Sequence, residues 1–188
     1  MSYNQYLEET LNALKMMQIR SEVIESVLLL LGDAVAKGGT LFFCGNGGSA
    51  ADSQHWAAEL TGVFRKEGKA MSAIALTVDT SSITAIANDS DYKYVFSRQL
   101  EGLGREGDVL IAISTSGNSS SIIEAAMTAQ NLGIKVVGIS GNGGGSLKNI
   151  CDIVIDAPGE KTEVIQHVHA TIGHYLLGAI EDLYRVAT

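Results

Sequence analysis

Apolar runs that end in glycine-rich turns constrain the fold of this chain more than any other feature. The run at 41–44 leads into Gly-Asn-Gly-Gly-Ser, and the run at 109–113 leads into Ser-Thr-Ser-Gly-Asn-Ser. A helix-like segment follows each turn. Strands that alternate with helices at this spacing predict right-handed βαβ units and a parallel sheet covered by helices on both faces. Ligands bind at the carboxyl edge of such sheets, which is where both turns are expected.

The hydrophobic periodicity predicts an α/β protein: a single domain over residues 1–188, with a three-layer αβα sandwich around a five-stranded parallel sheet. Five strands are typical of a flavodoxin-like fold. The expected strands are at 40–44, 72–77, 108–113, 134–140 and 152–156. The expected helices are at 48–61, 81–87, 92–102, 119–132 and 162–185, with a short helix near 145–150. Residues 1–37 add two N-terminal helices, and because their apolar stripes need a partner, we expect them to serve in oligomerisation.

The charge and hydropathy of the chain exclude several classes of partner. A formal net charge of −8 argues against a nucleic-acid surface, which needs basic residues, although a small phosphate needs only local donors. The N-terminus has neither the basic region nor the apolar core of a signal peptide. No apolar stretch approaches the roughly 20 residues that cross a bilayer. We therefore expect a cytoplasmic protein that binds neither nucleic acid nor a membrane.

The turn at 114–119 has the layout of an anion-binding site. Backbone N–H groups at the start of a helix have no intrahelical partner, and the helix dipole favours negative charge there. Hydroxyl donors come from Ser114, Thr115, Ser116 and Ser119. The turn has no lysine or arginine and no nucleotide P-loop motif, which favours a monophosphate. The alternative is a plain turn in which Asn118 or Ser119 caps the helix.

A third glycine-rich stretch, at 141–145, also follows an apolar run. It is interpreted either as another loop at the same sheet edge or as a turn without ligand contact.

Two helices carry residues that can do chemistry. His55 and Glu59 are four residues apart and share a helix face, so they can bind a metal, act as an acid/base pair, or form an ordinary solvated pair. Gln166 and His174, on the last helix, lie about 80° apart around the axis and can line one cavity. A composite site drawing on both helices is the favoured interpretation. That helix also carries His167 and His169, and one or two of its three histidines are expected to be packed or solvated.

Taken in order, these motifs resemble the phosphoheptose isomerases of the sugar-isomerase-domain (SIS) family. The resemblance rests on residues 44–52, His55, Glu59, 87–89, 113–119, 165–166 and His174, and it covers essentially the whole chain. It implies an aldose–ketose isomerase that converts sedoheptulose 7-phosphate to D-glycero-D-manno-heptose 7-phosphate in heptose and lipopolysaccharide biosynthesis. It also implies a homotetramer with its active sites between subunits.

The resemblance further implies roles for individual residues. The phosphate would be held by Ser114, Thr115, Ser116 and Ser119. The rest of the substrate would contact Asn46, Gly47, Gly48, Glu59, Asn88, Asp89 and Gln166. Glu59 would be the base and His174 the acid. Zinc would be bound by His55, Glu59, Gln166 and His174.

Two positions depart from the family pattern. Val63 follows Thr61-Gly62 where the family usually has arginine, and Val164 stands where the family usually has another. Arg65 is the arginine nearest in sequence to Val63. A residue two positions further along a helix points to the opposite face, so the Arg65 side chain is expected on the other side of the helix from Val63. These losses bear on which sugar phosphate is used, because guanidinium groups suit phosphate and carboxylate partners.

Two other functions are compatible with the fold. One is a non-catalytic SIS module that binds a phosphosugar or a protein partner such as a replication initiator. Such paralogues tend to lack the glutamate and the final histidine, so Glu59 and His174 favour the enzyme. The other is an isomerase or lyase of an amino-sugar phosphate, which the full motif set disfavours.

Overall fold

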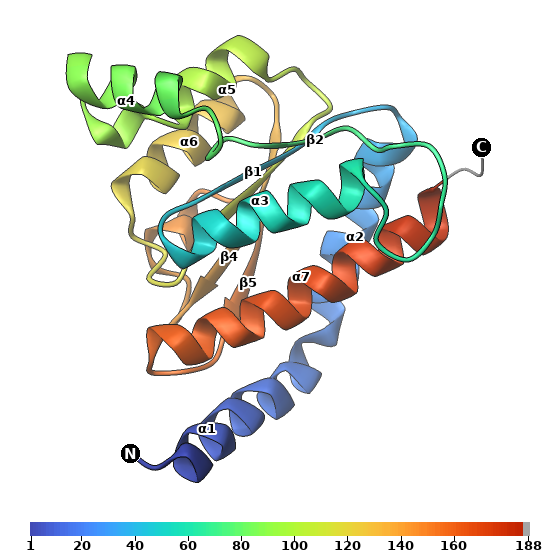
Figure 1. Ribbon diagram of the computed structural model, residues 1–188, viewed down its shortest axis with the longest axis vertical. Helices are drawn as coiled ribbons and strands as arrows, with labels where there is room; N and C mark the ends of the chain where they lie inside the picture. The colour runs from blue at the N-terminus through green and yellow to red at the C-terminus, as the bar shows by residue number, and fades with distance from the viewer. Residues whose placement is uncertain (186–188) are drawn as a thin grey trace.

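Five parallel strands form the centre of the fold, which the computed structural model describes over residues 1–185 (Figure 1). The strands are β1 (Leu41–Gly45), β2 (Ala73–Ala75), β3 (Val109–Ser114), β4 (Lys135–Gly141) and β5 (Ile153–Ala157). Their order in the sheet is β2-β1-β3-β4-β5. Every neighbouring pair is parallel. This order is that of flavodoxin-like folds, so the predicted fold class is confirmed.

The helices cover both faces of the sheet. They are α1 (Tyr3–Met16), α2 (Ser21–Ala36), α3 (Gly48–Thr61), α4 (Thr80–Asp89), α5 (Ser97–Leu103), α6 (Ser120–Asn131) and α7 (Thr162–Tyr184). Short 3-10 helices occupy Met17–Arg20, Tyr92–Tyr94 and Gly145–Asn149. The single helix expected at 92–102 was wrong, because a 3-10 turn at Tyr92–Tyr94 is separated from α5 by Val95 and Phe96, which are buried in the core.

The pleat of the strands divides the core into two halves. Phe43, Ile111 and Val137 point to the face covered by α2, α3 and α7. Phe42 and Leu110, one residue away, point to the face covered by α5 and α6. Because β1 and β3 are buried on both faces, they are continuous apolar runs in the sequence.

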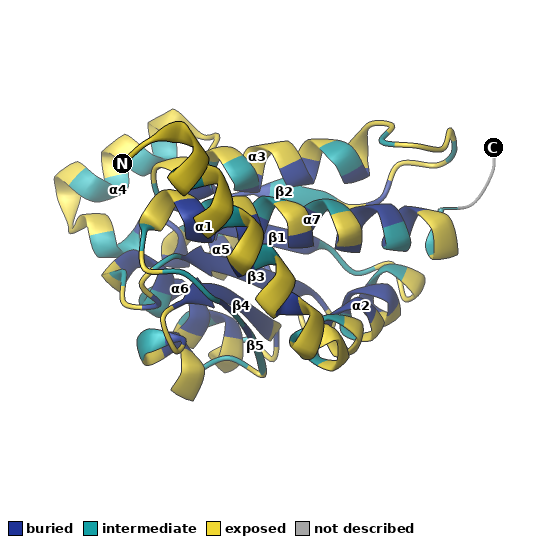
Figure 2. Ribbon diagram, turned by 90° about the horizontal axis from the view of Figure 1, so that it is seen from below, coloured by how far each residue is buried: buried dark blue, intermediate teal, exposed yellow. Residues whose placement is uncertain are grey.

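Helix α1 projects from this body and packs against α7 (Figure 1). Most of α1 is exposed in Figure 2, and among its residues only Ala13 is buried. Leu7 and Leu11 leave apolar side chains in solvent. In residues 1–185, no helix is long and apolar enough to cross a bilayer.

Candidate active site

The phosphate-loop candidate, residues 114–119, connects β3 to α6. The Ser114 hydroxyl lies 3.1 Å from that of Ser119 and 3.5 Å from that of Ser116, so the three hydroxyls face one another. Ser119 is the N-cap residue of α6, but its side chain makes no capping hydrogen bond. The Asn118 side chain instead donates to the Ser116 carbonyl and accepts from Ser146. Neither Ser119 nor Asn118 therefore caps α6 with its side chain, as the alternative interpretation of this turn required.

The glycine-rich stretch at 141–145 packs against the 114–119 loop. Gly117 has φ +65°, and a Cβ there would overlap the Gly144 carbonyl, so only glycine allows the two loops to pack. The Leu147 N–H donates to the Gly117 carbonyl at 3.1 Å. The stretch thus lies at the same sheet edge, as the first interpretation predicts. It packs against the 114–119 loop and does not line the cavity described next, so contact with a ligand stays untested.

A cavity of about 340 Å³ separates the 114–119 loop from the turn after β1. Its lining consists of Asn46, Gly47, Gly48, Ser49, Ile113, Ser114, Thr115, Ser119, Thr162 and Gln166. The N-terminus of α3 lines it through Gly48 and Ser49, and the N-cap residue, Gly47, has no side chain that could make a capping hydrogen bond or fill the space. The Gln166 amide lies where a Cβ on Gly48 would stand. Two predicted loops and Gln166 therefore meet around one space of ligand size.

Asn46 fixes the geometry of the first loop. Its amide nitrogen donates to the Ser121 hydroxyl at 3.0 Å, and its oxygen accepts from the Tyr92 hydroxyl at 2.8 Å. Sequence reasoning had missed Tyr92 and Thr162, because neither belongs to a recognisable motif. Only the fold brings them to the edge of the sheet.

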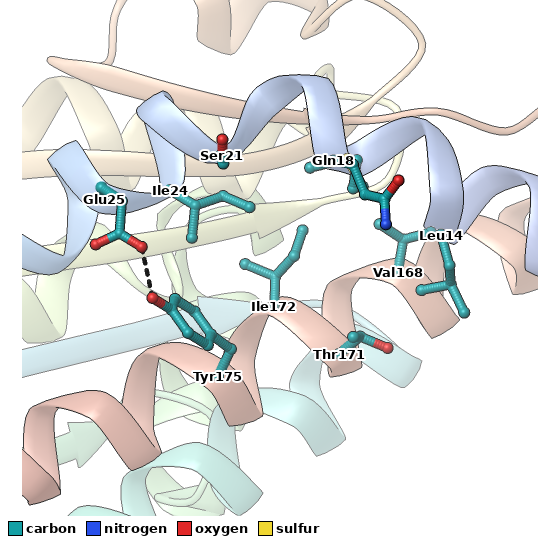
Figure 3. Close-up of a pocket in the computed structure, with 10 residues that line it drawn as sticks. Leu14, Gln18, Ser21, Ile24, Glu25, Val168, Thr171, Ile172 and Tyr175 are labelled. Carbon is teal, nitrogen blue, oxygen red and sulfur yellow. Dashed lines mark hydrogen bonds between the residues drawn. The ribbon is translucent and has the colours of Figure 1, made fainter.

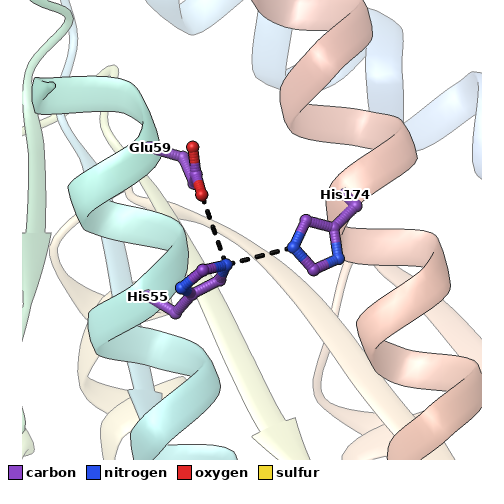
Figure 4. Close-up of side chains that lie close together, drawn as sticks. All are labelled: His55, Glu59 and His174. Atoms are coloured by element: carbon purple, nitrogen blue, oxygen red, sulfur yellow. Dashed lines mark hydrogen bonds and ion pairs between the residues drawn. The ribbon is translucent and has the colours of Figure 1, made fainter. Parts of the chain in front are cut away.

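The second half of the candidate site is a cluster of His55, Glu59 and His174, contributed by α3 and α7 (Figure 4). The Nε2 atom of His55 lies 3.3 Å from Oε1 of Glu59 and 3.0 Å from Nε2 of His174. The Nδ1 atom of His174 lies 2.8 Å from the Ala170 carbonyl. That contact places the proton on Nδ1 and leaves the Nε2 lone pair directed at the cluster.

This donor set fits a divalent transition metal. One nitrogen from each imidazole and one carboxylate oxygen all lie within 4.8 Å of one another. Ligand atoms about 2.0 to 2.1 Å from a tetrahedral ion are about 3.3 Å apart, close to the 3.0 and 3.3 Å found here. The His174–Ala170 hydrogen bond is the kind of outer contact that orients metal-bound imidazoles. Three of the four predicted ligands thus come together. The fourth, Gln166, lines the loop cavity from the same helix as His174.

Asp52, a neighbour of the cluster on α3, was not singled out from the sequence. Burial raises the pKa of its carboxyl, and the nearby His55 and His174 oppose that shift. It therefore adds a second carboxyl group near the imidazoles.

Asn88 and Asp89 lie away from both halves of the site in a single chain. They end α4 on the surface, where the Asn88 amide donates to the Asp89 carboxylate at 2.8 Å. Asp89 lines a different cavity, together with Tyr94 and Arg98.

Val63 and Val164, which depart from the family pattern, and the nearby Arg65 all lie outside the lining of the loop cavity. Helix α3 ends at Thr61, so the helical argument for Arg65 was wrong: Arg65 lies in the following loop, with its guanidinium 4.7 Å above the Phe64 ring. Val63 is 60% exposed. Val164 is buried in the core and is absent from the cavity lining. Phe64, which sequence reasoning missed, packs against His174 with ring centroids 5.8 Å apart.

The two remaining histidines of α7 are ordinary, as expected. His169 is fully buried, and its Nε2 lies 3.0 Å from the Ser140 carbonyl. Burial lowers the pKa of His169. His167 is exposed and pairs with the Tyr6 hydroxyl.

A separate apolar groove of about 490 Å³ lies between the N-terminal helices and α7 (Figure 3). Leu14, Ile24 and Ile172 point into it, and the Tyr175 hydroxyl donates to Glu25 at its edge. It contains none of the cluster residues and is not the site of the chemistry.

The chain matches known proteins in both sequence and structure. The SIS domain family matches residues 2–141. A probable phosphoheptose isomerase from Thermoplasma acidophilum is 44% identical over 98% of this chain and 100% of its own length. A phosphoheptose isomerase from Campylobacter jejuni is 50% identical over 81% of this chain and 82% of that protein. The solved structure of a phosphoheptose isomerase from Neisseria gonorrhoeae aligns with a TM-score of 0.90 at 37% identity, covering 96% of this chain and 97% of that one. The chain therefore belongs to the phosphoheptose isomerase family of SIS-domain proteins.

Proposed function

We propose that this protein converts sedoheptulose 7-phosphate to D-glycero-D-manno-heptose 7-phosphate through an enediol, the reaction implied by its family. The observation that carries the proposal is the meeting of Glu59 with His174, from different helices, beside His55. Aldose–ketose isomerisation needs a base for the carbon-bound proton and a second group that moves protons between oxygens. A carboxylate and an imidazole with a directed lone pair supply both.

The spacing of the two halves of the site suits such a substrate. Gly48 and Gln166 lie at the amino-terminal ends of α3 and α7, while His55 and His174 come seven and eight residues later. At about 1.5 Å per residue, the halves are roughly 10 to 12 Å apart along the helices. An open-chain sugar phosphate has its phosphate and its carbonyl at opposite ends. Binding of the remote phosphate therefore orients the reacting carbons.

In this mechanism, hydroxyls and backbone N–H groups at 114–119 hold the phosphate, and the 46–48 turn holds the sugar. Glu59 accepts the carbon-bound proton and returns it to the neighbouring carbon. His174 offers Nε2, since Nδ1 is engaged with the Ala170 carbonyl, and this one atom serves either to move the proton between the two oxygens or to hold a metal, not both at once. Phe64 covers one side of the His174 ring and limits access of water to it.

We also propose zinc as the metal, held by His55, Glu59, Gln166 and His174. Two imidazoles and a carboxylate are a donor set that zinc prefers. When bound, a divalent ion polarises the substrate carbonyl and stabilises the charge of the enediolate.

The assembly is proposed to be a homotetramer with sites between subunits. The apolar groove of Figure 3 and the exposed leucines of α1 support it, because a partner subunit would cover them. In such an assembly, Asn88 and Asp89 of one subunit would contact the sugar bound in the site of its neighbour. Light scattering that reports the mass of one chain would contradict this part. The cytoplasmic location expected from the sequence stays a prediction.

Turnover of sedoheptulose 7-phosphate, followed by NMR with and without a chelator, tests the function. We expect conversion that is lost on chelation and restored by Zn²⁺. Glu59→Gln should abolish turnover while phosphosugar binding persists, and Glu67→Gln, on the exposed loop nearby, is the matched control. Near-normal turnover in Glu59→Gln would remove Glu59 as the base. Binding without conversion in the native protein would favour the non-catalytic module.

A further inference from the structure

A buried ion pair at the carboxyl end of α7 contacts the chain that leaves the active-site helix α3. The Nε atom of Arg185 lies 3.2 Å from Oε1 of Glu181. The side chain of Glu181 is 1% exposed and that of Arg185 is 0% exposed. Neither residue contributes a ligand atom to the cluster or lines the loop cavity. Burial of two charges is unfavourable unless their remaining hydrogen-bonding groups are satisfied, so the partners of this pair indicate what it does.

The Glu181 carboxylate binds the loop that follows α3. It accepts the Phe64 N–H at 3.2 Å and the Arg65 N–H at 2.6 Å, one with each oxygen. Hydrogen bonds from backbone N–H groups to a buried carboxylate are stronger than those between neutral groups. The carboxylate thus fixes the backbone of Phe64, the residue whose ring packs on His174.

The Arg185 guanidinium binds the end of α3 itself. Its Nη2 donates to the carbonyls of Glu59 at 3.2 Å and Leu60 at 2.9 Å, and its Nη1 donates to the Gly62 carbonyl at 2.5 Å. The last carbonyls of a helix lack intrahelical partners, and a positive charge there also complements the helix dipole. Arg185 is therefore a cap for α3, and one of the carbonyls it holds belongs to Glu59.

We infer that Glu181 and Arg185 are positioning residues, which hold the end of α3 and residues 62–66 so that Glu59 and Phe64 keep their places beside His174. The pair acts on the cluster through two routes: the Glu59 backbone and the Phe64 ring. The inference rests on the proposed function only where turnover is measured, since metal binding and backbone protection do not involve the sugar.

Hydrogen exchange of the unmodified protein is the first test. Because the Phe64 and Arg65 N–H groups donate to a buried carboxylate, peptides spanning 62–66 should retain two amides that exchange as slowly as the core of α7. Exchange of every amide in this loop at the rate of exposed chain would overturn the inference, with no variant needed.

Variants test the link to the cluster. Glu181→Gln leaves Arg185 buried without its counter-charge and can unfold the protein, so the main variant is the double substitution Glu181→Leu/Arg185→Met, which replaces the pair by apolar side chains of similar size. Asp182→Asn is the matched control, because Asp182 pairs with Lys66 of the same loop at 2.8 Å but is exposed.

The double variant should bind Co²⁺ or Zn²⁺ about 10- to 100-fold more weakly than the control, as expected when outer contacts of metal ligands are lost. Its kcat should fall, while its KM should stay within about twofold because the phosphate loop is at the far end of the helices. A double variant with the metal affinity and Co²⁺ spectrum of the control would overturn the inference. If the unmodified protein binds metal but converts no heptose phosphate, the proposed function fails. The metal-binding and hydrogen-exchange measurements then still decide whether Glu181 and Arg185 are positioning residues.

Discussion

Gly48→Ala is predicted to damage the site without damaging the fold. Gly48 is the first residue of α3 and its φ is not in the left-handed region, so the backbone accepts alanine. The added Cβ would overlap the Gln166 amide and no backbone atom, which means that only a flexible side chain has to move. That movement displaces Gln166 from the loop cavity.

The two consequences can be given magnitudes. Replacing glycine by alanine at a compatible position stabilises a protein by about 0.4 to 1 kcal/mol, and for a chain of this length 1 kcal/mol corresponds to about 2 to 4 °C in Tm. Loss of a hydrogen bond to a charged group costs about 1.5 to 3 kcal/mol, or about 10- to 140-fold in kcat/KM. We therefore expect Tm to be unchanged or slightly raised and kcat/KM to fall by at least tenfold.

The assay combines thermal unfolding with steady-state turnover and a double-mutant cycle. Gly102→Ala is the control, since a Cβ there meets nothing within 4 Å. If alanine at 48 acts only through Gln166, then Gln166→Ala and the double variant Gly48→Ala/Gln166→Ala should have equal kcat/KM. A Gly48→Ala enzyme as active as Gly102→Ala, or a double variant that loses the sum of both effects, would refute the reasoning.

Two further predictions address the phosphate loop and the buried histidine. Ser119→Ala should raise KM about tenfold with Tm nearly unchanged, because its hydroxyl faces Ser114 and makes no capping bond. Asp79→Ala, which removes an observed cap, should instead lower Tm and leave KM unchanged. A fall in Tm with unchanged KM for Ser119→Ala would restore the capping alternative. Burial lowers the pKa of His169 in the folded protein. Below the ordinary histidine value of about 6.5, the unfolded chain therefore binds a proton that the folded chain does not, and stability falls. His169→Gln should lose less stability between pH 8 and pH 5.5, by up to about 1.4 kcal/mol, and parallel Tm curves for the two proteins would contradict this.

Local sequence patterns were sufficient for most elements of the fold. Continuous apolar runs identified β1 and β3 because both are buried on two faces, and the Gly-Asn-Gly-Gly-Ser turn identified the start of α3. The prediction of one helix at 92–102 was wrong, because a 3-10 turn followed by an α-helix has nearly the same hydrophobic spacing in the sequence as one continuous helix. The break between them depends on Val95 and Phe96 packing into the core.

The sequence by itself determined which candidate groups were available: two glycine-rich turns at one sheet edge, one of them with the layout of an anion-binding site, and a histidine and a glutamate on one helix face. Those relations follow from strand direction and helical periodicity, which are local. Only the tertiary structure decided that His174 meets His55, 119 residues away, and that Gln166 lies against Gly48 while Asn88 stays on the surface. It also decided that Arg185 binds the end of α3 and that Glu181 binds the loop after it, across 116 to 126 residues of sequence. Such contacts depend on how α3 and α7 pack side by side on the sheet, and no periodicity within either helix encodes that packing.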